Sequence, residues 1–206
     1  MKKDVLFILL LLVIIAVAMQ GQAAANLITN GSFDVSVPSN GTGGGWTSSN
    51  IDGSGGWRIS GGLPDEMFIL NDAGAVSTDP TIQQLVTGLT PGATYRLTGN
   101  YANFWLSYGS LGANTFAVDV DGITLDKLDY PGPAGWGLFL FDIVAPDSDL
   151  SIAFRAEIDG DDTDYMIDNI SLVYISNGDD VPEPSTILLL ASGLAGLAAL
   201  RRKFKI

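Results

Sequence analysis

Residues 94–102 read Thr94-Tyr95-Arg96-Leu97-Thr98-Gly99-Asn100-Tyr101-Ala102, and they alternate in character from one residue to the next. The alternation places Tyr95, Leu97, Gly99 and Tyr101 on one face and Arg96, Thr98 and Asn100 on the other. Because successive side chains of a strand point to opposite sides, this pattern predicts a half-buried β-strand. The preceding Thr90-Pro91-Gly92 predicts a turn that leads into it.

The same period recurs through residues 26–176, and no helical period persists there. Phe116, Val118 and Val120 alternate with polar or small residues, and Asp121-Gly122 then predicts a tight hairpin. Residues 150–158 alternate in the same way, and residues 166–175 form a largely apolar final strand. Turn residues separate these runs at short intervals. The sequence therefore predicts an all-β domain over residues 26–176, folded as an antiparallel β-sandwich of the jelly-roll type.

The N-terminal residues 1–25 have the pattern of a secretory signal peptide. Lys2 and Lys3 precede an unbroken apolar run over residues 5–18, and Ala23-Ala24-Ala25 offers small residues for cleavage before Asn26. The alternative is a retained N-terminal anchor, although the apolar run is shorter than the ~20 residues that a membrane-spanning helix needs. We expect the chain to be exported.

The C-terminal residues have a second, different pattern. A short linker over residues 177–181 leads to Val181-Pro182-Glu183-Pro184-Ser185-Thr186, an apolar helix is predicted over residues 187–200, and Arg201-Arg202-Lys203 follows at once. The two prolines keep the motif out of the helix. By the positive-inside rule the basic residues stay in the cytoplasm, which leaves the motif outside the inner membrane. The alternative is an ordinary tail anchor.

This order of motif, helix and basic tail resembles the PEP-CTERM sorting signal of Gram-negative bacteria. The resemblance covers residues 182–206 and the preceding Val181, and residues 201–205 form the basic tail. The residues that match the signal are Val181, Pro182, Glu183, Pro184, Arg201 and Arg202. It implies recognition and cleavage by an exosortase, with the single transmembrane helix holding the chain in the inner membrane only transiently. It also implies a final place on the cell surface or in the extracellular or biofilm matrix of a host that makes exopolysaccharide.

The charge and composition of the central domain exclude several classes of function. Between Asn26 and Val181 there are four basic and 21 acidic residues, a formal charge of −17. Such a surface repels phosphate backbones, so we expect no nucleic-acid partner. The chain has no Cys and no His, which excludes disulfides, catalytic dyads that use these residues and His-ligated zinc. Any bound metal would have oxygen ligands, which favours calcium or magnesium.

Three segments of the domain resemble the galactose-binding-like jelly rolls that include many carbohydrate-binding modules: residues 26–34, 83–95 and 167–172. The resemblance implies polysaccharide as a partner. It also implies a structural calcium between the first and last strands, at positions that match Asn30, Asp34 and Asp168. The alternative is that Asp34 is a turn residue and Asp168 a solvated or hydrogen-bonded one. The acidic run over residues 157–164 has two interpretations, a cation site and a solvated turn, and the sequence favours the solvated turn.

Aromatic residues are the candidates for contact with sugar rings. Trp105 and Tyr108 lie in a loop-like run over residues 103–114, and Trp57 flanks a loop rich in Gly and Ser. For Trp57 and Trp105 packing is an equally weighted alternative, and for Trp46 and Trp136 it is favoured.

No pair of carboxylates in the sequence is marked out as a catalytic pair for glycoside hydrolysis. The sequence therefore favours an exported, non-enzymatic carbohydrate-binding domain. The main alternative is a structural matrix or adhesion protein without a sugar site, followed by a glycan-active enzyme.

Overall fold

The computed structural model describes residues 25–53, 55–71, 78–103, 115–128, 135–157, 164–176 and 192–193. The chain divides into two compact units, one of Met1–Ala23 with Asp179–Ile206 and one of Ala24–Gly178. The predicted signal peptide up to residue 24, the sorting motif, the helix over 187–200 apart from residues 192–193, and the basic tail lie outside the described residues. Within the described residues, no helix is long and apolar enough to cross a membrane.

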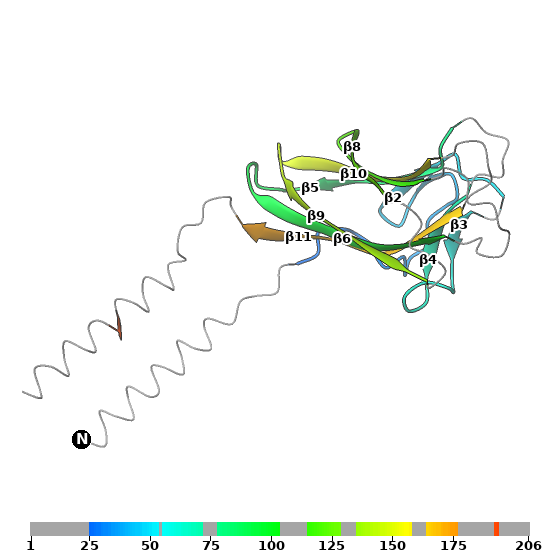
Figure 1. Cartoon of the computed structure of the whole chain (residues 1–206), viewed down its shortest axis with the longest axis horizontal. Coiled ribbons are helices and arrows are strands. Elements are labelled where there is room, and N and C mark those ends of the chain that lie inside the picture. The colour runs from blue at the N-terminus through cyan, green and yellow to red at the C-terminus, as the bar shows by residue number, and fades with distance from the viewer. Residues whose placement is uncertain are drawn as a thin grey trace, which may run out of the picture. The chain divides into compact units, whose positions relative to one another are not determined.

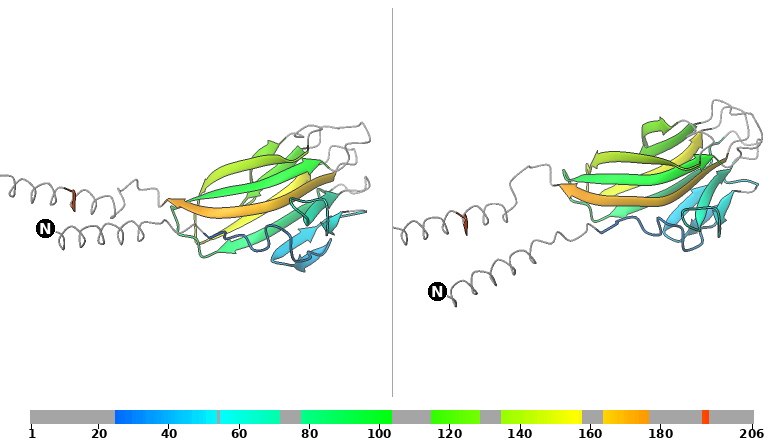
Figure 2. Two further views of the ribbon diagram at one scale, coloured as in Figure 1. Left: turned by 90° about the horizontal axis from the view of Figure 1, so that it is seen from below. Right: turned by 60° about the horizontal axis from the view of Figure 1, so that its bottom comes forward.

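The unit Ala24–Gly178 is a sandwich of two antiparallel sheets, which confirms the predicted all-β fold (Figures 1 and 2). One sheet has six strands in the order β1-β2-β5-β10-β7-β8, and the other has five in the order β3-β4-β11-β6-β9. The strands are β1 (Gly41–Gly43), β2 (Trp46–Ser49), β3 (Gly56–Arg58), β4 (Met67–Asn71), β5 (Thr81–Thr87), β6 (Thr94–Asn103), β7 (Thr115–Val120), β8 (Ile123–Leu128), β9 (Gly137–Val144), β10 (Asp149–Glu157) and β11 (Asp164–Ser176).

The turns predicted from the sequence have the expected geometry. Val120 pairs with Ile123, and the two residues between them, Asp121 and Gly122, have φ of 49° and 76°. Positive φ at both central residues is what a two-residue hairpin of the type I′ class requires. Before β6, the amide of Ala93 donates to the carbonyl of Thr90 at 3.1 Å, and Gly92 has a φ of 80°, as in a type II turn.

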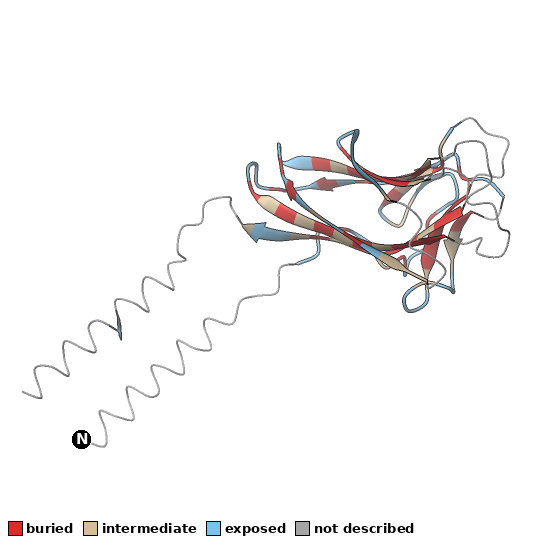
Figure 3. Ribbon diagram, viewed as in Figure 1, coloured by how far each residue is buried: buried red, intermediate tan, exposed pale blue. Residues whose placement is uncertain are grey.

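The core lies between the two sheets and consists of the inward half of each alternating strand (Figure 3). In β6 the buried residues include Tyr95, Leu97, Gly99 and Tyr101, as predicted. Aromatic rings form its centre: the ring of Phe116 stacks on those of Tyr101 and Phe154 at centroid distances of 5.2 and 5.9 Å. Trp46, for which the sequence favoured packing, is fully buried.

The long strand β11 joins the parts of the five-stranded sheet. It pairs with β4 on one side and β6 on the other. Beyond the β4 pairing, the N-terminal segment runs beside it: the amide of Leu27 donates to the carbonyl of Leu172 at 2.8 Å, and the amide of Ile170 donates to the carbonyl of Gly31 at 2.8 Å. The chain thus enters the unit beside the strand by which it leaves.

The close packing of Gly99 generates a prediction about stability. A Cβ atom at this position would lie 2.6 Å from Cδ1 of Ile170 and closer still to the ring of Phe139. Gly99→Ala should therefore destabilise residues 24–178 by about 1–3 kcal/mol, the cost of overpacking a filled core. Urea denaturation measures this change. Adding Phe139→Leu should recover part of the loss, and Thr98→Ala, on the outer face of the same strand, should have an effect within about 0.5 kcal/mol. Equal effects of the two single changes would contradict the packing argument.

Candidate functional site

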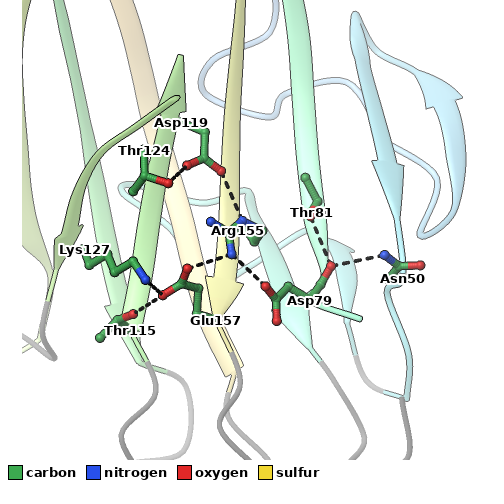
Figure 4. A network of polar contacts seen from close by, with 9 residues as sticks. All are labelled: Asn50, Asp79, Thr81, Thr115, Asp119, Thr124, Lys127, Arg155 and Glu157. Carbon is green, nitrogen blue, oxygen red and sulfur yellow. Dashed lines mark hydrogen bonds and ion pairs between the residues drawn. The ribbon is translucent and has the colours of Figure 1, made fainter. Parts of the chain in front are cut away.

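The main polar feature of the unit lies on the outer face of the six-stranded sheet (Figure 4). Its centre is Arg155 of β10, whose neighbours along the strand, Phe154 and Ala156, point into the core. Because side chains alternate along a strand, Arg155 and Glu157 point outward. We call this feature the polar platform and define it as Asp79, Thr81, Thr115, Asp119, Thr124, Lys127, Arg155 and Glu157.

Arg155 joins three carboxylates from three parts of the chain. Its Nη1 atom lies 2.7 Å from Oδ2 of Asp79 and 2.8 Å from Oε1 of Glu157, and its Nε atom lies 3.1 Å from Oδ2 of Asp119. Lys127 of β8 is a second cation, with Nζ 2.7 Å from Oε2 of Glu157. A single guanidinium therefore connects β10, β7 and the residue that leads into β5.

Hydroxyl groups complete the contacts of two of these carboxylates. Thr115 donates to Oε2 of Glu157 at 3.0 Å, and Thr124 donates to Oδ1 of Asp119 at 2.6 Å. At the side of β5, the hydroxyl of Thr81 and the side-chain nitrogen of Asn50 donate to the main-chain carbonyl of Asp79 at 3.1 and 3.2 Å. The platform is therefore a continuous hydrogen-bonded surface across β5, β10, β7 and β8.

Two groups of the platform, Glu157 and Arg155, are held in their ionised forms. Burial would raise the pKa of Glu157, but hydrogen bonds from Lys127, Arg155 and Thr115 outweigh it and hold this pKa below its usual range. Burial likewise opposes the charge on Arg155, and the bonds to Asp119, Asp79 and Glu157 outweigh it and raise the pKa of the guanidinium. The side chain of Arg155 is 23% exposed and that of Asp119 is 13% exposed, so solvent still reaches the network.

Small side chains lie between these charges in the sheet. Ala117 of β7 stands directly between Arg155 of β10 and Lys127 of β8 in the strand register, and Ala153 stands between Gln83 and Asp119. Carboxylates accept hydrogen bonds, ammonium and guanidinium groups donate them, and hydroxyls do both. Such a surface can bond neutral polyhydroxylated ligands, whose hydroxyl groups also both donate and accept.

No local sequence pattern predicts the platform. Glu157 belongs both to the alternating run over residues 150–158 and to the acidic run that follows; it lies in β10, as the alternation predicts, and its pairing with two cations was not predicted. Arg155 and Asp79 are 76 residues apart in the chain, so no local pattern links them. The available signal was the rarity of basic residues: Arg155 is one of only four in the domain.

The second site to consider surrounds Asp168 of β11, the predicted calcium ligand. Asp168 is 1% exposed. Its Oδ2 atom accepts a hydrogen bond from the amide of Leu63 at 2.5 Å, and its Oδ1 atom accepts one from the amide of Asn169 at 2.6 Å. A Cβ atom on Gly62 would lie 2.8 Å from Oδ2 of Asp168 and would strike the carbonyl of Glu66. The loop before β4 thus packs closely around this carboxylate.

Asp168 resists ionisation in the folded chain. Burial raises its pKa from 3.8 to about 6, the bonds from Leu63 and Asn169 act against this, and the negative charges of Asp34 and Glu66 add to it. The structure therefore brings Asp34 within electrostatic reach of Asp168. It also adds Glu66, which the sequence did not indicate.

Asn30 and Asp34 take part in local hydrogen bonds of the N-terminal turn. The side-chain oxygen of Asn30 accepts from the amide of Val35 at 2.9 Å, and its side-chain nitrogen donates to the carbonyl of Val35 at 2.8 Å. Oδ2 of Asp34 accepts from the hydroxyl of Ser32 at 2.7 Å. The roles of Asn30, Asp34 and Asp168 in metal binding stay predictions.

The carboxylates of Asp168, Asp34 and Glu66 offer oxygen ligands of the kind that calcium prefers, and a positive charge would offset the cost of ionising Asp168. Among the residues that the structure describes, no group of three or more Asp or Glu side chains is arranged to hold a metal ion. An ion here would therefore take main-chain carbonyls as most of its ligands.

The predicted aromatic residues fall in different parts of the chain. Trp57 lies in β3, on the other sheet from the platform, where it packs against the core and its Nε1 atom donates to the carbonyl of Phe33 at 2.6 Å. Trp105 and Tyr108 lie outside the described residues, in the segment between β6 of the five-stranded sheet and β7 of the six-stranded sheet. Trp136 is half-buried. The binding roles of Trp57, Trp105 and Tyr108 stay predictions.

Comparison with known proteins supports both the sorting tail and the fold. The family model of the PEP-CTERM protein-sorting motif matches residues 180–203, and this motif indicates an exported protein anchored or processed at the membrane of a Gram-negative bacterium. No protein among those with curated descriptions matches the chain.

Two solved structures share the fold. The module TmCBM61, solved in complex with β-1,4-galactotriose, is 15% identical, with 74% of this chain and 100% of that one covered and a TM-score of 0.53. A sugar-binding protein of Bacteroides thetaiotaomicron is 15% identical, with 73% and 100% covered and a TM-score of 0.52. The unit Ala24–Gly178 therefore has the jelly-roll fold of carbohydrate-binding modules.

The raised pKa of Asp168 predicts a pH dependence of stability. The unfolded chain releases this proton at lower pH than the folded one, so Asp168 destabilises the fold increasingly as the pH rises from 3.8 to about 6. Without divalent cations, the stability of residues 24–178 relative to the Asp168→Asn variant should fall by up to about 3 kcal/mol across this range. Urea denaturation at several pH values with a chelator measures this difference in stability. The contributions of the other carboxylates, which both proteins have, cancel in the comparison. A constant difference would show that Asp168 titrates normally.

Proposed function

We propose that this chain is an exported, non-enzymatic carbohydrate-binding protein that an exosortase sorts to the cell surface or the extracellular, biofilm matrix. The observation that carries the proposal is the polar platform, which lies across four adjacent strands on the outer face of a jelly-roll sheet. Polysaccharide is the partner that fits a surface rich in hydroxyl, carboxylate and cationic groups. The extended face of a sheet also suits a chain-like ligand.

The ligand would bond to the platform and stack on aromatic side chains. Asp119, Glu157 and Lys127 would bond to sugar hydroxyls. Trp105 and Tyr108, which precede β7 in the sequence, would supply the rings on which sugars stack. In this proposal Trp57, on the other sheet, contributes by holding the N-terminal turn through its hydrogen bond to Phe33.

The protonation states of the platform support binding rather than hydrolysis. A glycosidase needs one carboxylic acid with a raised pKa to protonate the leaving group. Glu157 has a lowered pKa because Lys127 and Arg155 bond to it, so it does not hold a proton at neutral pH. Asp168, a described carboxyl group whose pKa is raised, belongs to the other sheet.

One observation favours the alternative of a structural matrix or adhesion protein without a sugar site. The carboxylates around Arg155 already bond to cations and hydroxyls of the same unit, as in a network that only ties strands together. The two functions predict different results when an exposed platform group is removed. In a carbohydrate-binding protein the change weakens ligand binding without loss of stability, whereas in a structural protein there is no sugar binding to weaken.

A glycan array with residues 24–178 tests whether sugar is bound at all. No binding by a folded domain would refute the carbohydrate function. For a glycan that binds, Lys127→Ala should weaken binding by about tenfold in calorimetric titration with a soluble oligosaccharide, because Lys127 is more than half exposed and reaches the platform. The matched control is Arg96→Ala, which removes the cation of an exposed ion pair on the other sheet and should leave affinity unchanged. Equal effects would place the ligand elsewhere.

We also propose that Asn30, Asp34 and Asp168 hold a structural calcium ion, with main-chain carbonyls as its remaining ligands. The support is the buried carboxylate of Asp168 with two further negative charges in reach. Calcium should remove the loss of stability that Asp168 causes as the pH rises, and it should raise the melting temperature of the native domain but not of Asp168→Asn. The same pH profile with and without calcium would count against a bound ion.

The sorting proposal concerns the transit of the chain through the inner membrane. An exosortase would cut near Val181-Pro182-Glu183-Pro184 while the predicted helix 187–200 and the basic residues hold the tail. In the native host, the intact mass of the mature protein should lack both residues 1–25 and the segment after the motif. Glu183→Ala should accumulate with its C-terminal segment attached, whereas Glu66→Ala should be processed normally. Normal processing of Glu183→Ala would contradict recognition through the motif.

A further inference from the structure

The four sheet edges of the described sandwich differ in how they are protected from pairing with another chain. Edge strands expose unpaired main-chain groups, and proteins protect them by shortness, charge or a β-bulge. Strands β1 and β3 have only three residues each. Strand β8 carries Asp126 and Lys127, and its pairing with β7 is interrupted by a bulge at Val118 and Asp119.

The fourth edge, β9, has none of these protections apart from one charge. It is eight residues long, contains no Lys or Pro, and pairs without interruption to β6 from Gly137 to Val144. Among the described residues, β6 is its only neighbour in the sheet. Its outward side chains are apolar except for Asp142: Leu138 is 67% exposed, Leu140 50% and Val144 60%.

The surface next to this edge is electrically neutral, unlike the rest of the domain. Residues 94–103, 137–144 and 169–176 contain only two charged residues, Arg96 and Asp142. These two form a bidentate pair, with distances of 2.8 and 2.9 Å between their atoms, and so cancel. On a domain with a formal charge of −17, most faces repel a second copy, and this face does not.

We infer that β9 is the interface of a homodimer, in which the β9 strands of two copies pair antiparallel about a two-fold axis. The main-chain groups of both edges would then be hydrogen-bonded, and the two five-stranded sheets would form one continuous sheet. The exposed Leu138, Leu140 and Val144 of one copy would pack beside those of the other. The neutrality of the face favours a second copy over an oppositely charged partner.

The dimer is independent of the sugar proposal, because β9 and the polar platform belong to different sheets. A dimer would carry two platforms and could link two polysaccharide chains, which would raise its avidity for a matrix. A sugar-binding monomer would refute the dimer alone, and a dimer that binds no glycan would refute the sugar site alone.

Sedimentation velocity of residues 24–178 over a range of concentrations tests the inference. We expect a reversible dimer that strengthens as salt screens the net negative charge. Leu140→Lys should raise the dimer dissociation constant by at least about tenfold, because it places a charge in the apolar contact. Leu85→Lys is the matched control. Leu85 is also exposed, at 63%, but it lies on β5, which is a central strand of the other sheet and not an edge strand.

Hydrogen exchange identifies the surface that is used. The amides of β9 should exchange more slowly at concentrations where the dimer forms, and the amides of β8 should not change. Near-ultraviolet circular dichroism checks that Leu140→Lys is folded, and Val144→Lys provides a second variant of the same strand. A wild-type domain that stays monomeric at every concentration and salt would overturn the inference, as would equal effects of Leu140→Lys and Leu85→Lys.

Discussion

The ion pairs of Arg155 are the interaction on which the six-stranded sheet most depends. Three carboxylates approach one another across β5, β7 and β10, in a domain that has 21 acidic and four basic residues. Without the guanidinium their repulsion would oppose the pairing of these strands, since removing one partner from a partly buried network leaves the other charges uncompensated. The same pairing fixes the carboxylates, Lys127 and the threonine hydroxyls on one face of the sheet, and so creates the surface that we propose to bind sugar.

The two sheets have different roles in the domain. The six-stranded sheet presents polar groups to solvent, while the five-stranded sheet holds the chain together through β11, which receives β4, β6 and the N-terminal segment. Asp168 also helps to hold the five-stranded sheet together, because its hydrogen bond with Leu63 connects the loop before β4 to β11. In our proposals, the outer face of the six-stranded sheet binds sugar, and the edge strand β9 of the five-stranded sheet binds a second copy of the chain.

The sequence predicted the strands well because alternation is a local property. The buried faces of β6, β7 and β10 and the hairpin at Asp121 and Gly122 follow from neighbouring residues alone. The platform could not be predicted, because it joins residues from four strands, and neither could the contact between Asp168 and Leu63, which are 105 residues apart. For Trp57 the sequence left packing and binding equally weighted. Its hydrogen bond to Phe33 depends on how β3 lies against the N-terminal turn.

The central claim is that the outer face of the six-stranded sheet binds polysaccharide. The most direct measurement is an NMR titration of the isotopically labelled domain, residues 24–178, with an oligosaccharide that binds to it. The signals observed are those of the backbone amides and of the Arg155 guanidinium. Our account predicts that the largest shifts occur at Asp119, Lys127, Arg155 and Glu157, and that β11 and β9 are unaffected. Shifts confined to the five-stranded sheet, with the Arg155 signal unchanged, would contradict it.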